Sequence, residues 1–303
     1  MIVEHRPRVA QVFIETWESY DQNGNVLATG GKTFTYDSQN ELVGMSSGTT
    51  SVALIYDAFG NRVGKSVNGV VTRYLVDDLN PTGLPQVMEE LNGSGAVTRT
   101  YTYGLQRIDE EQVLSGAWTP SFYGYDGGGN VRQLTNSAGT ATDSYEYDAF
   151  GNSFTVSGST PNEMMYRGEQ FDSDLGLYYL RARYYNPTTG RFMSRDPNEP
   201  GPFDSNGVPT DPANLHKYLY ANGDPIDGID PMGRENLITR AFIAVKDFVL
   251  AHVVITPINV ALGVCFAAVV YELDMDIDHP GQGHGKKGNN LAFACTLAWL
   301  FLK

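Results

Sequence analysis

The stretch from residue 195 to residue 234 holds acidic residues whose spacing could do chemistry. Asp196 follows Arg195 and precedes a proline, Asp211 also precedes a proline, and Asp230 begins the sequence Asp-Pro-Met-Gly. Two carboxyl groups that converge can share one proton, because the charge of one raises the pKa of the other, and such a pair can activate water and protonate a carbonyl. An aspartate before a proline also commonly opens a turn, so the spacing alone leaves both interpretations open.

A second group of candidates lies near the C-terminus, in a Gly-rich stretch: Asp276, Asp278, His279 and His284. These residue types bind divalent metals, but the His-Pro step favours an extended turn, and we expect a solvated loop without a metal or cofactor. Cys265 and Cys295 lie in apolar stretches, where we expect packing rather than reactivity. We find no phosphate-binding loop and no nucleophile–histidine–aspartate pattern that would support an independent enzyme.

Composition narrows the class of protein. With 41% hydrophobic residues and 18% charged residues, the chain carries enough apolar surface to fold. Its formal charge of −14 repels phosphate backbones, so we expect no nucleic-acid binding by the main body. The first residues do not form a signal peptide. We therefore expect secretion or surface display by a non-classical route, or through upstream sequence of a longer protein of which this chain is a piece.

An internal repeat predicts the elements that must position the acidic residues. The pattern Tyr-Asp-x-x-Gly-Asn, or a close variant, begins at five tyrosines: Tyr20, Tyr36, Tyr56, Tyr125 and Tyr147. Alternating segments flank each copy, which is typical of a β-hairpin. Glycine supplies the positive φ that the turn needs, and the Asp and Asn side chains can bind the turn backbone. Two copies define the motif residues: Tyr56, Asp57, Gly60 and Asn61, and Tyr147, Asp148, Gly151 and Asn152.

Stacked hairpins predict a mainly β fold. A single hairpin is marginal in water, so the units must join edge to edge into one long, curving sheet. The repeat tyrosine should be half-buried, with its ring over the sheet and its hydroxyl at a polar edge. We place the hairpin array at residues 1–160.

The repeats resemble those of the RHS, or YD-repeat, family, which includes bacterial polymorphic toxins, insecticidal toxin-complex C subunits and the animal teneurins. Residues 166–197 resemble the RHS repeat-associated core almost position for position, and residues 214–222 and 225–233 continue the match. The resemblance implies that the hairpins form part of a spiral shell, that residues 161–234 are a core plug closing one end, and that the shell sequesters the segment 235–303.

Toxin members of this family cut their own chain after an Asp-Pro-x-Gly motif, by chemistry that resembles an aspartic protease. The corresponding cleavage motif is Asp230, Pro231, Gly233 and Arg234. The resemblance implies that the bond cut is Gly233–Arg234 or the next one. Arg234 departs from the family pattern, which has a large apolar residue there. Because a buried unpaired arginine is costly, we expect either a shifted bond or loss of cleavage.

The same resemblance assigns the catalytic residues. Asp196, with Arg195 before it, matches the first carboxylate, and Asp211 matches the second, with Asp204 as an alternative. Five arginines fall within the core block: Arg167, Arg181, Arg183, Arg191 and Arg195. Acidic residues are interleaved with them, so we expect ion pairs on the strand surface rather than a phosphate site.

Composition changes after residue 234, and we expect a short, mainly α segment there. Residues 248–271 are long and apolar enough to cross a bilayer, whereas residues 291–302 are too short to do so alone. Three interpretations stay open for this segment: a membrane-active effector, a small helical toxin domain held inside the shell, and a remnant of recombination.

The combined hypothesis is the C-terminal part of an RHS-type shell protein that encapsulates and delivers a C-terminal effector. As an enzyme it is at most a single-turnover aspartic self-protease. The expected partners are its own C-terminal segment as cargo, an immunity protein and a secretion apparatus. The alternatives are a non-enzymatic surface protein that contacts carbohydrate or membrane, with exposed tyrosines stacking on sugars, or a remnant without activity.

Overall fold

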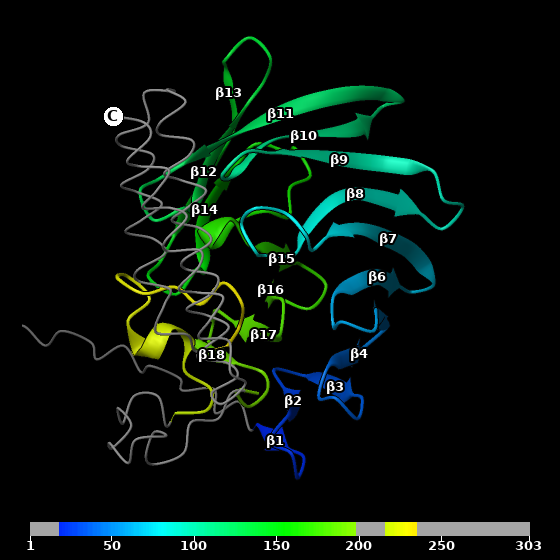
Figure 1. The fold of residues 1–303 in the computed structure, drawn as a ribbon, viewed down its shortest axis with the longest axis vertical. Coiled ribbons are helices and arrows are strands. Elements are labelled where there is room, and N and C mark those ends of the chain that lie inside the picture. Colours follow the sequence, from blue (N-terminus) through cyan, green and yellow to red (C-terminus); the bar gives the residue numbers. More distant parts are fainter. Residues whose placement is uncertain (1–17, 198–215, 235–303) are drawn as a thin grey trace, which may run out of the picture.

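The computed structural model describes residues 18–197 and 216–234. Within these residues, a 14-stranded antiparallel sheet follows the order of the chain, so each strand pairs with the next one (Figure 1). Its strands are β1 (Ser19–Tyr20), β2 (Val26–Thr29), β3 (Lys32–Tyr36), β4 (Leu42–Ser47), β5 (Thr50–Tyr56), β6 (Arg62–Val67), β7 (Val70–Asp77), β8 (Gln86–Asn92), β9 (Val97–Tyr103), β10 (Arg107–Leu114), β11 (Ala117–Tyr125), β12 (Val131–Thr135), β13 (Ala141–Tyr147) and β14 (Ser153–Ser157). The expected array of hairpins in a mainly β fold is confirmed.

A second, four-stranded sheet follows. It consists of β15 (Gln170–Asp172), β16 (Leu177–Leu180), β17 (Arg183–Asn186) and β18 (Arg191–Phe192). The short 3-10 helix η1 (Tyr166–Gly168) precedes it, and η3 (Tyr220–Gly223) comes after it in the chain. The large sheet curves around this small sheet (Figure 1). No helix of the described residues is long and apolar enough to cross a membrane.

Each repeat turn is held by its aspartate. The Asp57 carboxylate accepts hydrogen bonds from the backbone N–H groups of Phe59 (2.8 Å) and Asn61 (2.9 Å) and from the Asn61 side chain (3.1 Å). Gly60 has a φ of +82°, which a residue with a Cβ rarely adopts. The carboxylate of Asp148, in the repeat that begins at Tyr147, accepts the same three hydrogen bonds.

The repeat tyrosines join neighbouring hairpins and bend the sheet. The hydroxyl of Tyr56 donates to the carbonyl oxygen of Leu42 on β4 at 2.8 Å, and that of Tyr125 donates to Arg107 on β10 at 2.9 Å. At all five repeat tyrosines the pairing register shifts by a β-bulge or similar irregularity. Because a bulge bends its strand and increases the local twist, each repeat adds to the curvature of the sheet.

The concave side of the sheet is apolar at its two ends and charged between them. Side chains alternate in burial along β5, with Val52 and Leu54 buried. One core cluster joins β2–β5 to the small sheet through Leu177 and Tyr184, and a second joins β12 and β13 to it through Tyr178 and Tyr185. Five buried charged residues of the large sheet lie on β6 to β10 between these clusters, and a sixth, Asp143, lies on β13; the five are Arg62, Lys65, Glu90, Arg99 and Glu110.

Several expectations fall outside the described residues. They are the fold of the segment 235–303 with its two apolar stretches, Cys265 and Cys295, the Asp/His group near residue 280, and the aspartates Asp204 and Asp211.

Candidate active site

The cleavage motif forms a tight turn against the small sheet. The Asp230 carboxylate accepts from the backbone N–H of Arg234 at 2.9 Å, and the N–H of Gly233 donates to the Asp230 carbonyl oxygen at 3.2 Å. Gly233 has a φ of +64°, and a Cβ placed on it would collide with the carbonyl oxygen of Leu180. Only glycine permits this approach of two backbones.

Three consecutive residues hold the motif at the turn between β16 and β17. The Arg181 guanidinium donates to the carbonyl oxygen of Pro231, and the backbone N–H of Ala182 donates to that of Met232 at 3.1 Å. Nε of Arg183 donates to the carbonyl oxygen of Gly233. Residues 181–183 therefore bind the carbonyl groups of residues 231–233 one by one.

Arg183 also binds two carboxylates. Its Nη2 donates to Oδ2 of Asp196 at 2.6 Å and lies 3.3 Å from Oδ2 of Asp230. Arg183, Asp196 and Asp230 expose only 3%, 5% and 4% of their surface. The guanidinium carbon lies 3.6 Å from the centre of the Phe192 ring, which limits its movement. One buried guanidinium thus connects Asp196, Asp230 and the Gly233 carbonyl.

Backbone contacts hold Asp196 in this cluster. Its N–H donates to the carbonyl oxygen of Lys217 at 3.0 Å, and Nη1 of Arg183 donates to the same oxygen at 3.1 Å. A free carboxylate in such a position would pay a large desolvation cost, and the charge-assisted bonds to Arg183 offset it.

The surroundings of Asp230 favour its protonated form. The pKa of Asp230 is raised to about 6, chiefly by burial and in smaller part by the Asp196 carboxylate, while the nearby charge of Arg183 opposes the shift. Below about pH 6 the Asp230 carboxyl group is therefore largely protonated in the folded chain.

The structure brings some of the predicted site residues together and separates others. Asp196, Asp230 and Gly233 meet at Arg183. Arg195 is exposed, and its aliphatic part lies beside Gly24 in the first repeat turn. Arg234 is also exposed, so the cost of a buried charge that we expected at this position does not arise.

The central residue, Arg183, was placed by sequence reasoning among the strand-surface ion pairs, and this was wrong. It is buried, and its carboxylate partners lie 13 and 47 residues away in the chain. Strand alternation gave no signal for the burial of Arg183, because Arg181 lies in the turn before β17 with a φ of +56°. Arg181 does form an ion pair, with Glu169 at 3.0 Å.

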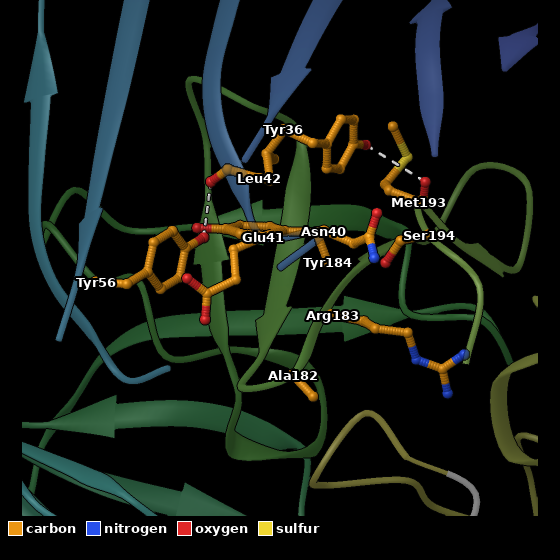
Figure 2. Close-up of a pocket in the computed structure, with 10 residues that line it drawn as sticks. All are labelled: Tyr36, Asn40, Glu41, Leu42, Tyr56, Ala182, Arg183, Tyr184, Met193 and Ser194. Atoms are coloured by element: carbon orange, nitrogen blue, oxygen red, sulfur yellow. Dashed lines mark hydrogen bonds between the residues drawn. The ribbon is translucent and has the colours of Figure 1, made fainter. Parts of the chain in front are cut away.

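A small pocket adjoins the cluster, between the two sheets. It is lined by Tyr36, Asn40, Glu41, Leu42, Tyr56, Ala182, Arg183, Tyr184, Met193 and Ser194. Figure 2 shows the Arg183 guanidinium turned away from Glu41, and the Tyr36 hydroxyl bound to the Met193 carbonyl oxygen. The pocket has a volume of about 10 Å³, which holds about one water molecule and is too small for a substrate or cofactor. In the described part of the chain no cluster of three metal-binding side chains occurs.

Two curated relatives each match 71% of the chain. The tRNA nuclease WapA of Bacillus subtilis (strain 168) is 37% identical over 225 residues, which cover 9% of that protein. The double-stranded DNA deaminase toxin A of Burkholderia cenocepacia (strain H111) is 24% identical over 247 residues, which cover 16% of that protein. The chain therefore spans less than a fifth of the length of these relatives.

Solved structures and a family model agree with these matches. A Tc holotoxin pore of Photorhabdus luminescens that contains TccC3 has a TM-score of 0.53 and 20% identity, covering 71% of this chain and 10% of that one. At this identity the likeness shows the fold, a strip of β-hairpins. The family model described as Teneurin YD-shell matches residues 8–226. This chain belongs to the teneurin YD-shell family.

Proposed function

We propose that this chain closes a YD shell around its own C-terminal segment and cuts that segment free once, by hydrolysis of the bond between Gly233 and Arg234. The proposal is supported chiefly by one observation: a single buried guanidinium binds the Gly233 carbonyl oxygen and the carboxylates of Asp196 and Asp230. A substrate carbonyl and carboxylates at one point are what an aspartic self-protease needs.

The roles follow from the chemistry of the reaction. Asp196 and Asp211 are the proposed catalytic carboxylates, one taking a proton from water and the other returning a proton to the leaving nitrogen. Asp230 and Gly233 shape the turn that presents the bond. Because enzyme and substrate are one chain, each molecule reacts once.

Toxin relatives support the role of the released segment. Proteins named as a tRNA nuclease and as a DNA deaminase toxin share this part of the chain. We propose residues 235–303 as cargo, with an immunity protein and a secretion apparatus as partners of a secreted or cell-surface protein.

The alternative of sugar contact by exposed tyrosines draws no support from four of the five repeat tyrosines, which are half-buried; Tyr20, at the edge of the sheet, is 43% exposed. Tyr36, Tyr56 and Tyr125 are half-buried, and their hydroxyls donate to backbone carbonyl groups. Rings held between hairpins in this way do not present a free face for stacking.

Intact mass spectrometry of the 303-residue chain tests the proposal. We expect the wild type to yield one fragment ending at Gly233 and another beginning at Arg234, and Asp196→Asn and Asp211→Asn to stay whole. Asp148→Asn, in an exposed repeat turn, is the matched control and should still be cut. A wild-type chain that keeps its full mass would remove self-cleavage and leave a structural shell segment.

A further inference from the structure

Two apolar side chains on one rim of the large sheet are almost fully exposed. Phe59, in the turn between β5 and β6, is 85% exposed, and Leu79, in the loop between β7 and β8, is 93% exposed, the highest values among the large apolar residues that the structure describes. Neighbouring connections on the same rim are two strand spacings, about 10 Å, apart, so the two residues form one patch, here called the rim patch. Isolated exposed apolar residues are common, and a binding role for the rim patch needs further evidence.

An identical hexapeptide elsewhere in the chain shows how such a turn is covered by a partner. Tyr-Asp-Ala-Phe-Gly-Asn occurs at residues 56–61 and again at residues 147–152. In the second copy, the backbone carbonyl oxygens of residues 149, 150 and 151 accept hydrogen bonds, at 2.8, 2.8 and 2.9 Å, from three tyrosine hydroxyls on or beside the small sheet: Tyr166, Tyr185 and Tyr178. The Phe150 ring lies against Gly190, and only 40% of Phe150 is exposed. The small-sheet region thus binds this turn through both its carbonyl groups and its phenylalanine.

The first copy of the hexapeptide lacks this cover within the described residues. The carbonyl oxygens of residues 58–60 accept no hydrogen bond there, and Phe59 is far more exposed than Phe150. The turn itself is formed in the same way, since the carboxylates of Asp57 and Asp148 accept the same three bonds. The two copies therefore differ in their surroundings rather than in the bonds that form the turn, and the first presents the same binding groups on an exposed surface.

The chain leaves the cleavage motif beside the rim patch. The Arg181 guanidinium donates to the carbonyl oxygen of Pro85, at the end of the β7–β8 loop, at 3.3 Å, and also to that of Pro231. One side chain therefore joins this loop to the motif, and the C-terminal segment begins a few residues after Pro231. Six extended residues span about 20 Å, which is about twice the distance between neighbouring turns, so residues 235–240 can reach across the rim patch.

The residues that follow the motif carry the groups that the rim patch requires. Leu237, Ile238 and Phe242 are apolar, as a cover for two exposed apolar side chains must be. Asn236 and Thr239 have side chains that donate hydrogen bonds, as a partner for free carbonyl groups must. This stretch therefore offers the same two kinds of contact that the small-sheet region makes with the second copy of the hexapeptide.

We propose that residues 235–245 dock on the rim patch, with their apolar side chains covering Phe59 and Leu79 and their polar side chains donating to the carbonyl groups of residues 58–60. Burial of apolar surface stabilises this contact, and the hydrogen bonds give it a preferred position. The inference goes beyond the proposed function and holds whether or not the chain cuts itself. Its consequence is that a cut alone does not release the C-terminal segment, because the first residues after the cut remain bound to the shell.

Limited digestion of the 303-residue chain with trypsin tests the docking. Trypsin cuts after Arg240 and Lys246, which lie within and just after the docked residues. Because a protease cuts a docked segment only while it is undocked, the rate reports on docking. A synthetic peptide of residues 235–250 gives the rate for the same bonds without docking, and mass spectrometry identifies the products.

We expect trypsin to cut the wild type after Arg240 about 100-fold more slowly than the peptide. Phe59→Ser and Leu79→Ser should each raise this rate about tenfold, because each removes one large apolar contact, and the double variant should approach the rate of the peptide. Val70→Ser is the matched control: Val70 is 73% exposed at the opposite end of β7, and this variant should be cut at the wild-type rate. Thermal melting followed by circular dichroism shows that all variants are folded.

A double-mutant cycle connects the two surfaces directly. Phe242→Ser should also be cut about tenfold faster than the wild type, because it removes the partner side of the same contact. Adding Phe59→Ser to Phe242→Ser should then raise the rate only slightly, since residues in contact do not act additively. Adding Val70→Ser instead should change nothing.

The outcomes that overturn this inference differ from those that overturn self-cleavage. A wild type that trypsin cuts as fast as the peptide removes the docking, and so do Phe59→Ser and Leu79→Ser variants cut at the wild-type rate. An equal acceleration by Val70→Ser would show a general loosening of the sheet and would also contradict the docking. Protection that rises with protein concentration would mean that a second copy of the chain covers the rim patch instead. A chain that shows the expected protection but never cuts itself removes self-cleavage alone.

Discussion

At the scale of single residues, Gly233 shows how a backbone conformation and a chemical role depend on each other. Its positive φ turns the chain so that its carbonyl oxygen faces Arg183, and its missing side chain leaves space for the Leu180 carbonyl group. A residue with a Cβ would have to give up either the turn or the contact with the small sheet.

Gly233→Ala should therefore lower stability and stop self-cleavage. We expect Gly139→Ala, at a turn with a φ of +75° and open space around the added Cβ, to lose only the about 1–2 kcal/mol of left-handed strain. Gly233→Ala adds a backbone collision and should lose more. Chemical denaturation and intact mass measure both effects. Equal losses for the two variants, with cleavage intact, would contradict the close approach described here.

Glu110 is a buried glutamate whose ionised form is disfavoured in the folded protein. Burial raises the pKa of Glu110 to about 7, and the Arg99 guanidinium, 3.5 Å away, opposes this shift first. Tyr123 and Gln112 donate to its carboxyl oxygens at 2.9 and 3.0 Å, and Glu90 shares the same arginine. The protonated form is therefore favoured in the folded protein relative to the unfolded chain.

The free energy of unfolding should fall as pH rises from about 4.5 to about 7. In that window the folded state binds more protons than the unfolded state, because the folded pKa of Glu110 lies above its ordinary value. The contribution is at most about 3 kcal/mol. Glu110→Gln should flatten this slope, whereas Glu111→Gln, at the exposed neighbouring position, should not. Urea unfolding at pH 4.5, 6 and 8 measures the slopes, and identical slopes for wild type and Glu110→Gln would refute the assignment.

At the scale of elements, the repeat turn could be predicted because its chemistry is local. Asp57 binds groups two and four residues ahead of it, so its type and spacing are visible in a short stretch of sequence. The bulge at each repeat tyrosine is tied to the same motif. The hairpin order and the curvature of the large sheet follow from these local rules repeated along the chain.

Removing the turn aspartate should weaken one hairpin measurably. Asp57→Ala deletes the three contacts that hold its turn, and we expect a loss of about 1–2 kcal/mol, comparable to a lost helix cap. Asp78→Ala changes an exposed aspartate in the next loop on the same rim and should cost far less. Denaturant titration of both variants provides the comparison, and equal stabilities would show that the repeat aspartate is dispensable.

The site could be predicted only in part, because its decisive contacts join distant segments. Asp196 and the Asp-Pro-Met-Gly motif are visible in the sequence. Arg183 reaches Asp196, Asp230 and Gly233 across 13, 47 and 50 residues, and no local pattern shows that those side chains meet. The charged middle of the concave side was missed for the same reason. Strand alternation shows which residues face inward, but their partners lie on other strands or on the small sheet.

At the scale of the whole molecule, the two sheets are joined by apolar clusters and by a buried charge bridge. Asp172 on β15 accepts from Lys65 at 2.8 Å and pairs with Arg62 at 3.4 Å, both on β6, and all three side chains are nearly inaccessible to water. Asp174 pairs with the same lysine at 2.9 Å, but its side chain is about one-third exposed. The bridge thus offers one buried and one exposed partner of a single cation.

Breaking the buried half of this bridge should unfold both sheets together. Asp172→Ala leaves two buried cations without their main carboxylate, which typically costs about 3–5 kcal/mol. Asp174→Ala removes a partly exposed partner and should cost less than about 1 kcal/mol. Hydrogen exchange followed by mass spectrometry should show faster exchange in β5–β7 and in β15–β17 alike for Asp172→Ala, because the two sheets share one core. Faster exchange confined to the small sheet would mean instead that the large sheet holds its curvature alone, and that the small sheet is a separable insert.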